Sequence, residues 1–194
     1  MANDILDQAI HFAVNAHAGQ LRKDGSPFIL HPLEDAAIVS TMTTDRNTLA
    51  AAVLHDTVED TDVTIEEIAA QFGPRVYELV LHETEDKRPT IPPEDTWQVR
   101  KEESLAVLAA SDDPAVKMLW LGDKLSNIRD LRRSYEKVGA AAFDLFNNVN
   151  PLAHKWYYGS VLELLQELRD YPAYQEYAAC YHAVFDHFEG EYHV

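Results

Sequence analysis

The stretch AAAVLHDTVEDT, residues 50–61, joins an apolar run to four ionisable side chains. If the segment is helical, His55 and Glu59 share one face, and Asp56 and Asp60 share a second face about 100° away. Imidazole and carboxylate groups so close together compete for protons unless a cation lies among them. The stretch therefore indicates a metal site. Acidic residues after an apolar run are also typical of a solvated helix end, and the stretch alone leaves both interpretations open.

Hydrophobic periodicity and helix-boundary residues predict further helices on both sides of this stretch. The first covers residues 4–18, with Asn3 or Asp4 as its cap and Gly19 as its end. We expect the others at residues 32–42, 46–60, 64–72, 74–84, 95–110, 114–131, 137–150, 151–169 and 172–189. Residues 85–95 contain three prolines and are predicted to form an exposed loop. Without a convincing strand or repeat, residues 1–194 are predicted to form one all-α domain of about eight to ten helices.

Two residues distant from this stretch complete a candidate ligand set. His31 precedes Pro32, which suits the first turn of a helix, so the imidazole is expected at the helix start. Asp123 lies within a helix that is apolar nearly all round, where a carboxylate is costly unless it is paired or coordinated. A satisfied structural histidine and a buried salt bridge are the alternatives. We favour metal ligation, with the ligand set His31, His55, Asp56 and Asp123.

The charge of the chain favours a small anionic ligand over a nucleic-acid polymer. The formal net charge is −17, so the chain lacks the basic character that phosphate backbones require. Its basic residues are nevertheless clustered, and such local clusters suit a small anion. Solvated helix faces remain the alternative for most of them. The clusters contain Arg22 and Lys23; Lys87, Arg88, Arg100 and Lys101; and Lys124, Arg129, Arg132 and Arg133.

The composition predicts a cytoplasmic globular protein. Of the 194 residues, 46% are hydrophobic and 25% are charged. No run approaches the ~18 apolar residues of a membrane span, and residues 1–4 lack the features of a signal peptide. The single cysteine, Cys180, excludes an internal disulfide and a cysteine-based zinc cluster. We expect no membrane partner, and the sequence does not define an oligomeric state.

Four segments resemble the hydrolase domain of the RelA/SpoT alarmone family, within the HD-domain metal-dependent phosphohydrolases. They are residues 16–25 (AHAGQLRKDG), 31–33 (HPL), 55–61 (HDTVEDT) and 122–131 (GDKLSNIRDL). The resemblance implies an HD-domain helical bundle with a motif-bearing core at about residues 5–165. A C-terminal helical extension at about 170–190 has no predicted function and is expected to be an additional core helix. Because the chain has no room for synthetase and regulatory domains, it resembles the small, stand-alone alarmone hydrolases of the Mesh1 type.

The resemblance also implies a role for each matching residue. One Mn²⁺ per chain, with other divalent ions possible, would be bound by His31, His55, Asp56 and Asp123. Glu59 and Asp60 would orient and deprotonate the attacking water. Two imidazoles and two carboxylates without a thiolate independently suit Mn²⁺ or Fe²⁺ better than structural zinc. Four protein ligands leave positions for water and a phosphate oxygen.

The implied substrate contacts are basic and polar side chains. Arg22 and Lys23 would flank the guanine, and Asn127 with Arg129 or Lys124 would contact the sugar and phosphates. The implied reaction removes the 3′-pyrophosphate of ppGpp or pppGpp, leaving GDP or GTP and pyrophosphate.

The chain departs from the family pattern outside the metal ligands. Phe28 replaces a tyrosine, Ser126 occupies a position where relatives often have histidine or tyrosine, and residues 82–87 keep only part of the usual motif. These differences concern the identity of the substrate. The alternatives are an HD phosphohydrolase acting on another nucleotide, such as an NADPH 2′-phosphatase or a nucleotide phosphatase, and a nucleotide sensor without turnover.

Overall fold

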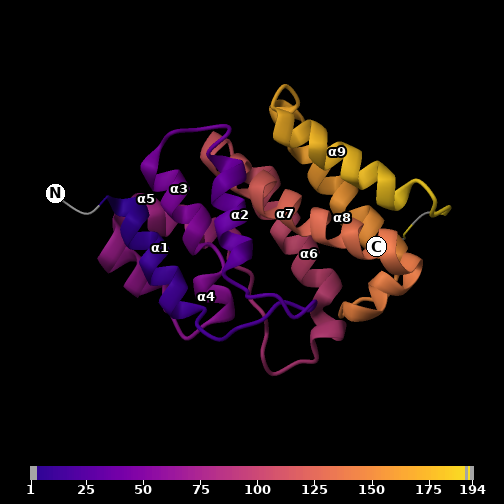
Figure 1. Ribbon diagram of the computed structural model, residues 1–194, viewed down its shortest axis with the longest axis horizontal. Coiled ribbons are helices and arrows are strands. Elements are labelled where there is room, and N and C mark those ends of the chain that lie inside the picture. Colours follow the sequence, from indigo (N-terminus) through magenta and orange to yellow (C-terminus); the bar gives the residue numbers. More distant parts are fainter. Residues whose placement is uncertain (1–3, 191, 193–194) are drawn as a thin grey trace. The chain divides into compact units, whose positions relative to one another are not determined.

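The computed structural model describes residues 4–190 and residue 192, and these residues form helices joined by loops (Figure 1). No strand occurs among them; residues Leu21 and Pro27 form an isolated bridge. The predicted all-α class is therefore confirmed. The helices are α1 (Ile5–Ala16), α2 (Leu30–Val39), α3 (Arg46–Leu54), α4 (Thr57–Asp60), α5 (Ile65–Glu83), α6 (Pro93–Ala110), α7 (Pro114–Val138), α8 (Pro151–Leu164) and α9 (Pro172–Phe185), with 3-10 helices at Gly139–Leu145 and Gln166–Leu168.

The helices group into two compact units. One comprises Met1–Glu85 and Ser111–Asp123, and the other comprises Asp86–Ala110 and Lys124–Val194. The sequence-based expectation of one domain over residues 1–194 stays a prediction. No helix of the described residues combines the length and the apolar character that a membrane crossing requires.

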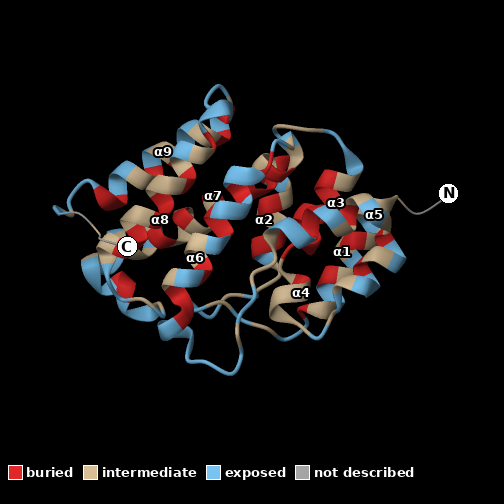
Figure 2. Cartoon of the chain, turned by 180° about the vertical axis from the view of Figure 1, so that it is seen from behind, coloured by how far each residue is buried: buried red, intermediate tan, exposed pale blue. Residues whose placement is uncertain are grey.

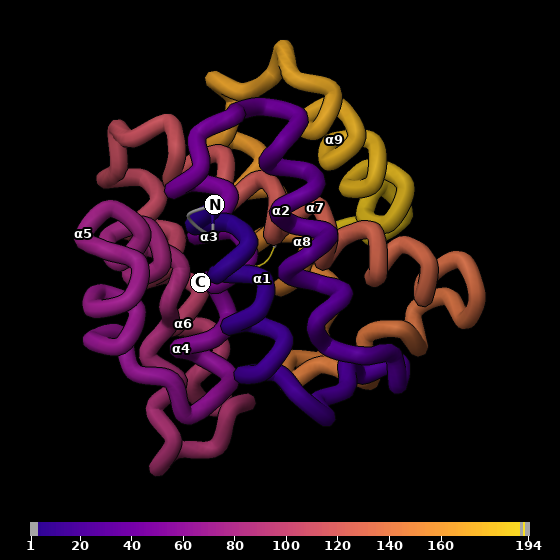
Figure 3. Tube along the Cα trace, turned by 60° about the vertical axis from the view of Figure 1, so that its left-hand side comes forward, coloured from indigo at the N-terminus to yellow at the C-terminus, as the bar shows by residue number. Residues whose placement is uncertain are grey.

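Helix α3 is the centre of the first unit. It packs against α1, α2 and α5, whose traces can be followed in Figure 3. Its residues from Thr48 to Leu54 are all buried, as Figure 2 shows in red, because small alanines allow the neighbouring helices to approach closely. Asp45 caps the helix, and its Oδ2 accepts a hydrogen bond from the Thr48 backbone N–H at 2.9 Å. This rigid, apolar helix leads directly into His55 and Asp56.

The second unit has an aromatic core. Helix α8 packs against α6 and α9, and the Tyr177 hydroxyl of α9 donates a hydrogen bond to the Tyr158 carbonyl of α8 at 2.9 Å. Phe143, Tyr177 and Phe185 are fully buried. The aromatic residues near the C-terminus therefore serve as core, as expected for a helical extension.

The helices expected at 64–72 and 74–84 both form: α5 spans them as one element, and the non-helical backbone of Gly73, where φ is +83°, separates them as predicted. Other predicted boundaries differ from the structure. The helix expected at 137–150 is wrong: α7 continues to Val138, and Gly139, with a φ of +64°, ends it before a short 3-10 helix. Glycine adopts this left-handed conformation without steric cost, so it is a natural helix end. The last helix ends at Phe185, four residues before the expected 189.

Candidate metal centre

The four predicted ligands all lie in the first unit. His31 is in the first turn of α2, and Asp123 lies within α7. His55 and Asp56 lie between α3 and α4. His31, His55 and Asp123 are buried, with side chains at most 6% exposed, and Asp56 is 17% exposed. The site is thus enclosed by helices that are themselves packed.

The junction between α3 and α4 interrupts the helix predicted at 46–60. The Thr57 hydroxyl donates to the Leu54 carbonyl at 2.6 Å, and His55 Nδ1 lies 2.8 Å from the Ala52 carbonyl oxygen. These side chains satisfy carbonyls that the ending helix leaves without intrahelical partners. Because a carbonyl can only accept, His55 Nδ1 must carry a proton. A neutral His55 therefore has its lone pair on Nε2.

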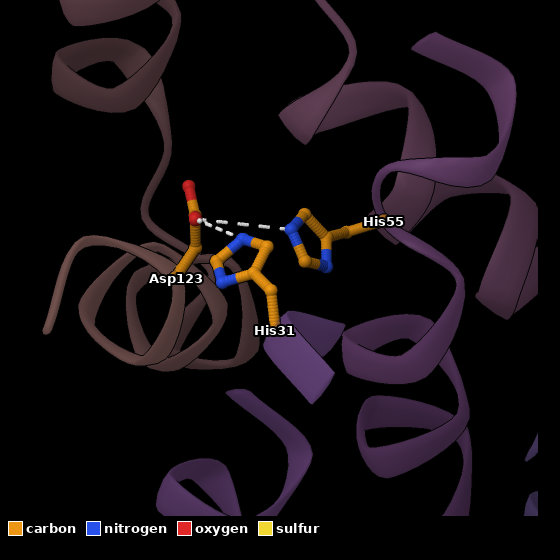
Figure 4. Close-up of side chains that lie close together, drawn as sticks. All are labelled: His31, His55 and Asp123. Atoms are coloured by element: carbon orange, nitrogen blue, oxygen red, sulfur yellow. Dashed lines mark ion pairs between the residues drawn. The ribbon is translucent and has the colours of Figure 1, made fainter. Parts of the chain in front are cut away.

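Both histidines direct Nε2 toward carboxylate oxygens. His31 Nε2 lies 3.1 Å from Asp123 Oδ1 and 3.4 Å from Asp56 Oδ2. His55 Nε2 lies 3.2 Å from Asp56 Oδ2 and 3.8 Å from Asp123 Oδ1. Figure 4 shows three of these side chains, with one Asp123 oxygen facing a nitrogen of each ring. Two imidazoles and two carboxylates therefore surround one small volume.

The mutual charges of these groups shift their pKa values. Burial lowers the pKa of His31, but hydrogen bonds to Asp123 and Asp56 outweigh burial and raise it. Burial also opposes the charged form of His55, but the charge of Asp56 raises its pKa well above the usual value. Burial raises the pKa of Asp56, whereas the His55 charge lowers it, and the net result is a pKa well below the usual range. The carboxylates therefore favour the charged form of both rings, and the rings favour the charged form of Asp56.

The arrangement fits a divalent metal ion. Donor atoms of His31, His55 and Asp123 lie within 4.8 Å of one another, and neighbouring ligands of an octahedral ion with bonds of about 2.1 Å are about 3 Å apart. His55 Nε2 is buried and makes no hydrogen bond within the described residues, although Asp56 Oδ2 is near. In the neutral ring this nitrogen presents a lone pair beside carboxylate oxygens, an arrangement suited to a cation, whose binding would displace protons from the cluster.

The proposed water-activating residues are held by neighbouring backbone and side chains. Glu59 Oε2 accepts a hydrogen bond from the Glu85 backbone N–H at 3.1 Å. The Asp60 carbonyl accepts one from Gln20 Nε2 at 2.7 Å, and Gln20 Oε1 lies 2.8 Å from His17 Nδ1. Sequence reasoning assigned no role to His17 or Gln20, although both belong to the 16–25 motif. Through Gln20, that motif fixes α4.

The predicted substrate-binding residues are divided between the two units. Arg22, half-buried, and Lys23, exposed, lie in the loop after α1 in the first unit. Lys124, Asn127 and Arg129 belong to the second unit. There the Arg129 guanidinium forms a bidentate ion pair with Glu176, at 2.7 and 2.6 Å. The roles of all five in substrate binding stay predictions.

Asp35 is a buried acidic residue that the sequence analysis did not single out. It is 0% exposed, and burial raises the pKa of its carboxyl to about 8. Its Oδ2 lies 3.3 Å from His55 Nδ1. The available signal was its spacing: Asp35 is four residues after His31, on the same helix.

This helical scaffold, with a His–Asp pair at a helix end and a histidine and an aspartate from two other helices, defines an HD domain. The HD-domain family model matches residues 9–156, and the chain belongs to this family. Human MESH1, a guanosine-3′,5′-bis(diphosphate) 3′-pyrophosphohydrolase, is 42% identical over 130 residues, which are 65% of this chain and 69% of the human protein. Within the family, the chain is a RelA/SpoT-type HD hydrolase domain.

Two further relatives extend this comparison. A guanosine-3′,5′-bis(diphosphate) 3′-pyrophosphohydrolase of Aquifex aeolicus (strain VF5) is 35% identical over 170 residues, 86% of this chain. The chain spans only 23% of the length of that relative. The solved structure of a metazoan SpoT ortholog, described as hydrolysing ppGpp, superposes with a TM-score of 0.74 at 25% identity. That match covers 93% of this chain and 96% of the other.

Proposed function

We propose that this protein hydrolyses ppGpp and pppGpp to GDP or GTP and pyrophosphate, using one Mn²⁺ held by His31, His55, Asp56 and Asp123. The convergence of these four side chains carries the proposal, because the ring nitrogens and carboxylate oxygens lie 3.1–3.8 Å apart. The substrate is inferred from the relatives, since human MESH1 and the Aquifex aeolicus protein carry the name of this activity.

The donor set supports a hard, octahedral ion such as Mn²⁺. Nitrogen and oxygen ligands without thiolate suit Mn²⁺ or Fe²⁺. When bound, such an ion would polarise a phosphoryl oxygen and lower the pKa of its water. The protein supplies the preorganised ligands: the Ala52 carbonyl fixes the His55 tautomer, and the low pKa of Asp56 keeps that carboxyl ionised.

In the proposed reaction, water oxygen forms a bond to the phosphorus attached to the ribose 3′ oxygen, and the bond between that phosphorus and the 3′ oxygen breaks. Glu59 and Asp60 would orient the water and accept its proton, and the 3′ oxygen leaves with a proton. The hydrogen bond from Glu85 to Glu59 and the attachment of Asp60 to Gln20 support a fixed orientation of α4. Arg22, Lys23, Lys124, Asn127 and Arg129 would bind the guanine, sugar and phosphates.

The proposed partner is a small anionic nucleotide, and we also propose a cytoplasmic location. The net charge of −17 supports neither a nucleic-acid polymer nor an anionic membrane as partner. The single cysteine, Cys180, is buried and unpaired with another cysteine, as is usual in reducing compartments.

A substrate panel with Mn²⁺ tests this function. We expect release of pyrophosphate from ppGpp with formation of GDP, and loss of both products in the Asp123→Ala variant, which should not retain the metal. Intact ppGpp together with dephosphorylation of NADPH or another nucleotide would reassign the substrate within the same chemistry. Nucleotide binding without any turnover would indicate a sensor and refute the proposed enzyme.

A further inference from the structure

Asp35 occupies a position where a carboxylate is energetically unfavourable unless a specific interaction compensates for its burial. It is 0% exposed, and neither of its carboxylate oxygens makes a hydrogen bond within the described residues. A buried polar group without hydrogen bonds normally destabilises a protein, and a buried charge does so more strongly. An apolar side chain in the middle of α2 would avoid this cost. The residue therefore calls for an interaction that requires a carboxyl group at this position.

The Asp35 carboxyl lies beside the ring of a proposed metal ligand. Asp35 Oδ2 lies 3.3 Å from His55 Nδ1, on the opposite side of the ring from Nε2, which faces Asp56 and Asp123. The Ala52 carbonyl at 2.8 Å aligns the Nδ1 proton. A carboxylate beside the protonated nitrogen makes the other nitrogen a stronger ligand, a pattern common behind metal-bound histidines.

Asp35 also fits the backbone beside a second proposed ligand. A β-carbon placed on Gly122 would lie 2.0 Å from Asp35 Oδ1 and 2.7 Å from Val39 Cγ2. The carboxylate thus occupies the space that any side chain at position 122 would need. Gly122 directly precedes Asp123, so close packing of α7 on Asp35 sets the position of that ligand. A third ligand, His31, lies one helical turn before Asp35 on α2.

We propose that Asp35 is a positioning residue of the metal centre. Its buried carboxylate faces the His55 ring and packs on the Gly122 backbone, and through these contacts it holds His55 and Asp123 where their donor atoms converge with His31 and Asp56. The inference rests on the proposed metal site. It assigns to that site a supporting carboxylate that is not itself a ligand.

Mn²⁺ binding by purified full-length chains tests this role. Titration calorimetry should give about one site for the wild type. In Asp35→Asn, which keeps the side-chain size but removes the acidic group, the Kd for Mn²⁺ should rise by roughly 10–100-fold, the usual effect of losing such a group. Glu34→Gln, which removes a negative charge from the neighbouring, less buried position of α2, is the matched control and should change the Kd less than twofold.

Asp35→Ala is a second variant, whose smaller side chain can be accommodated in the space that Asp35 occupies. Circular dichroism of each metal-free chain verifies that the variants fold. A Kd within twofold of the wild type in either folded variant would overturn the positioning role, because a residue needed only for packing changes the melting temperature and not the metal affinity. A wild-type chain that binds no Mn²⁺ would instead refute the proposed metal centre. The two failures are therefore distinguishable.

Discussion

Replacement of Gly122 by alanine tests how tightly the core beneath Asp123 is packed. Gly122 lies inside α7, where alanine has the higher helix propensity. A new β-carbon would lie 2.0 Å from Asp35 Oδ1 and 2.7 Å from Val39 Cγ2. Both neighbours are 0% exposed, so neither can move into solvent. At position 122, helix propensity therefore favours alanine, whereas steric overlap with Asp35 and Val39 opposes it.

The steric effect should dominate. Helix propensity favours alanine over glycine by about 1 kcal/mol. Overpacking a close-packed core costs about 1–3 kcal/mol, and the 2.0 Å approach to Asp35 places Gly122→Ala at the upper end of this range. The net loss of unfolding free energy is then about 2 kcal/mol, which lowers Tm by roughly 4–8 °C in a chain of this size. Displacement of Asp123 should also weaken Mn²⁺ binding.

Thermal unfolding of the metal-free chains, with Mn²⁺ titration of the same samples, measures both effects. Gly159→Ala is the matched control, since Gly159 is also helical but its nearest neighbour is the hydroxyl of Tyr181, a partly exposed side chain that can move. The control should be neutral or slightly stabilising. A Gly122→Ala chain that gains stability and binds Mn²⁺ like the wild type would refute the packing argument.

Three further variants test separate parts of the site. Glu59→Gln should keep one Mn²⁺ per chain and lose roughly 10²–10⁴-fold in turnover; loss of metal, measured by elemental analysis, would instead make Glu59 a ligand. Gln20→Ala removes the hydrogen bond to the Asp60 carbonyl, so amide hydrogen exchange in α4 should accelerate; unchanged exchange would contradict this tether. Asp45→Ala removes the α3 cap and should cost about 1 kcal/mol in urea unfolding at pH 7. Because hydrogen bonds from Thr48 lower the Asp45 pKa, this difference should be complete above about pH 4 and vanish as pH falls through the lowered folded-state pKa; a difference that persists at pH 2 would contradict it.

The sequence predicted helices best where local chemistry defines their ends. Thr64 and Glu67 form a capping box at the start of the helix predicted from residue 64, with both reciprocal hydrogen bonds present. Asp4 caps α1, and its side chain accepts from the Leu6 backbone N–H; the alternative cap, Asn3, lies outside the described residues. Pro151 and Pro172 open α8 and α9 as expected. Such signals involve neighbouring residues only, so they can be recognised without tertiary information.

The missed boundaries depend on interactions that hydrophobic periodicity does not report. Residues 132–138 are mostly polar but extend α7, where Arg132 and Glu136 form an i, i+4 ion pair at 2.8 Å. The break after Leu54 arises because the side chains of His55 and Thr57 bind backbone carbonyls. Both features were present in the sequence as polar residues, but their partners became evident only in the structure.

The candidate site likewise contains residues that could be recognised from the sequence and one residue that could not. A His–Asp pair after an apolar run, a histidine at a helix start and an aspartate in an apolar helix were each recognisable by their unfavourable surroundings. Asp35 was not, because one acidic residue in an amphipathic helix is usually solvent-exposed. Its burial results from the packing of α2 against α3 and from the absence of a side chain at Gly122. Such a role can be recognised only when it is known which helices pack together.

Anomalous diffraction at the manganese edge from crystals grown with Mn²⁺ would locate the ion directly. We predict one strong peak per chain, within bonding distance of His31 Nε2, His55 Nε2 and one oxygen each of Asp56 and Asp123. If the peak lies elsewhere, or if the four side chains stay joined by protons with no peak among them at saturating Mn²⁺, the proposed centre does not exist and the hydrolytic function loses its basis.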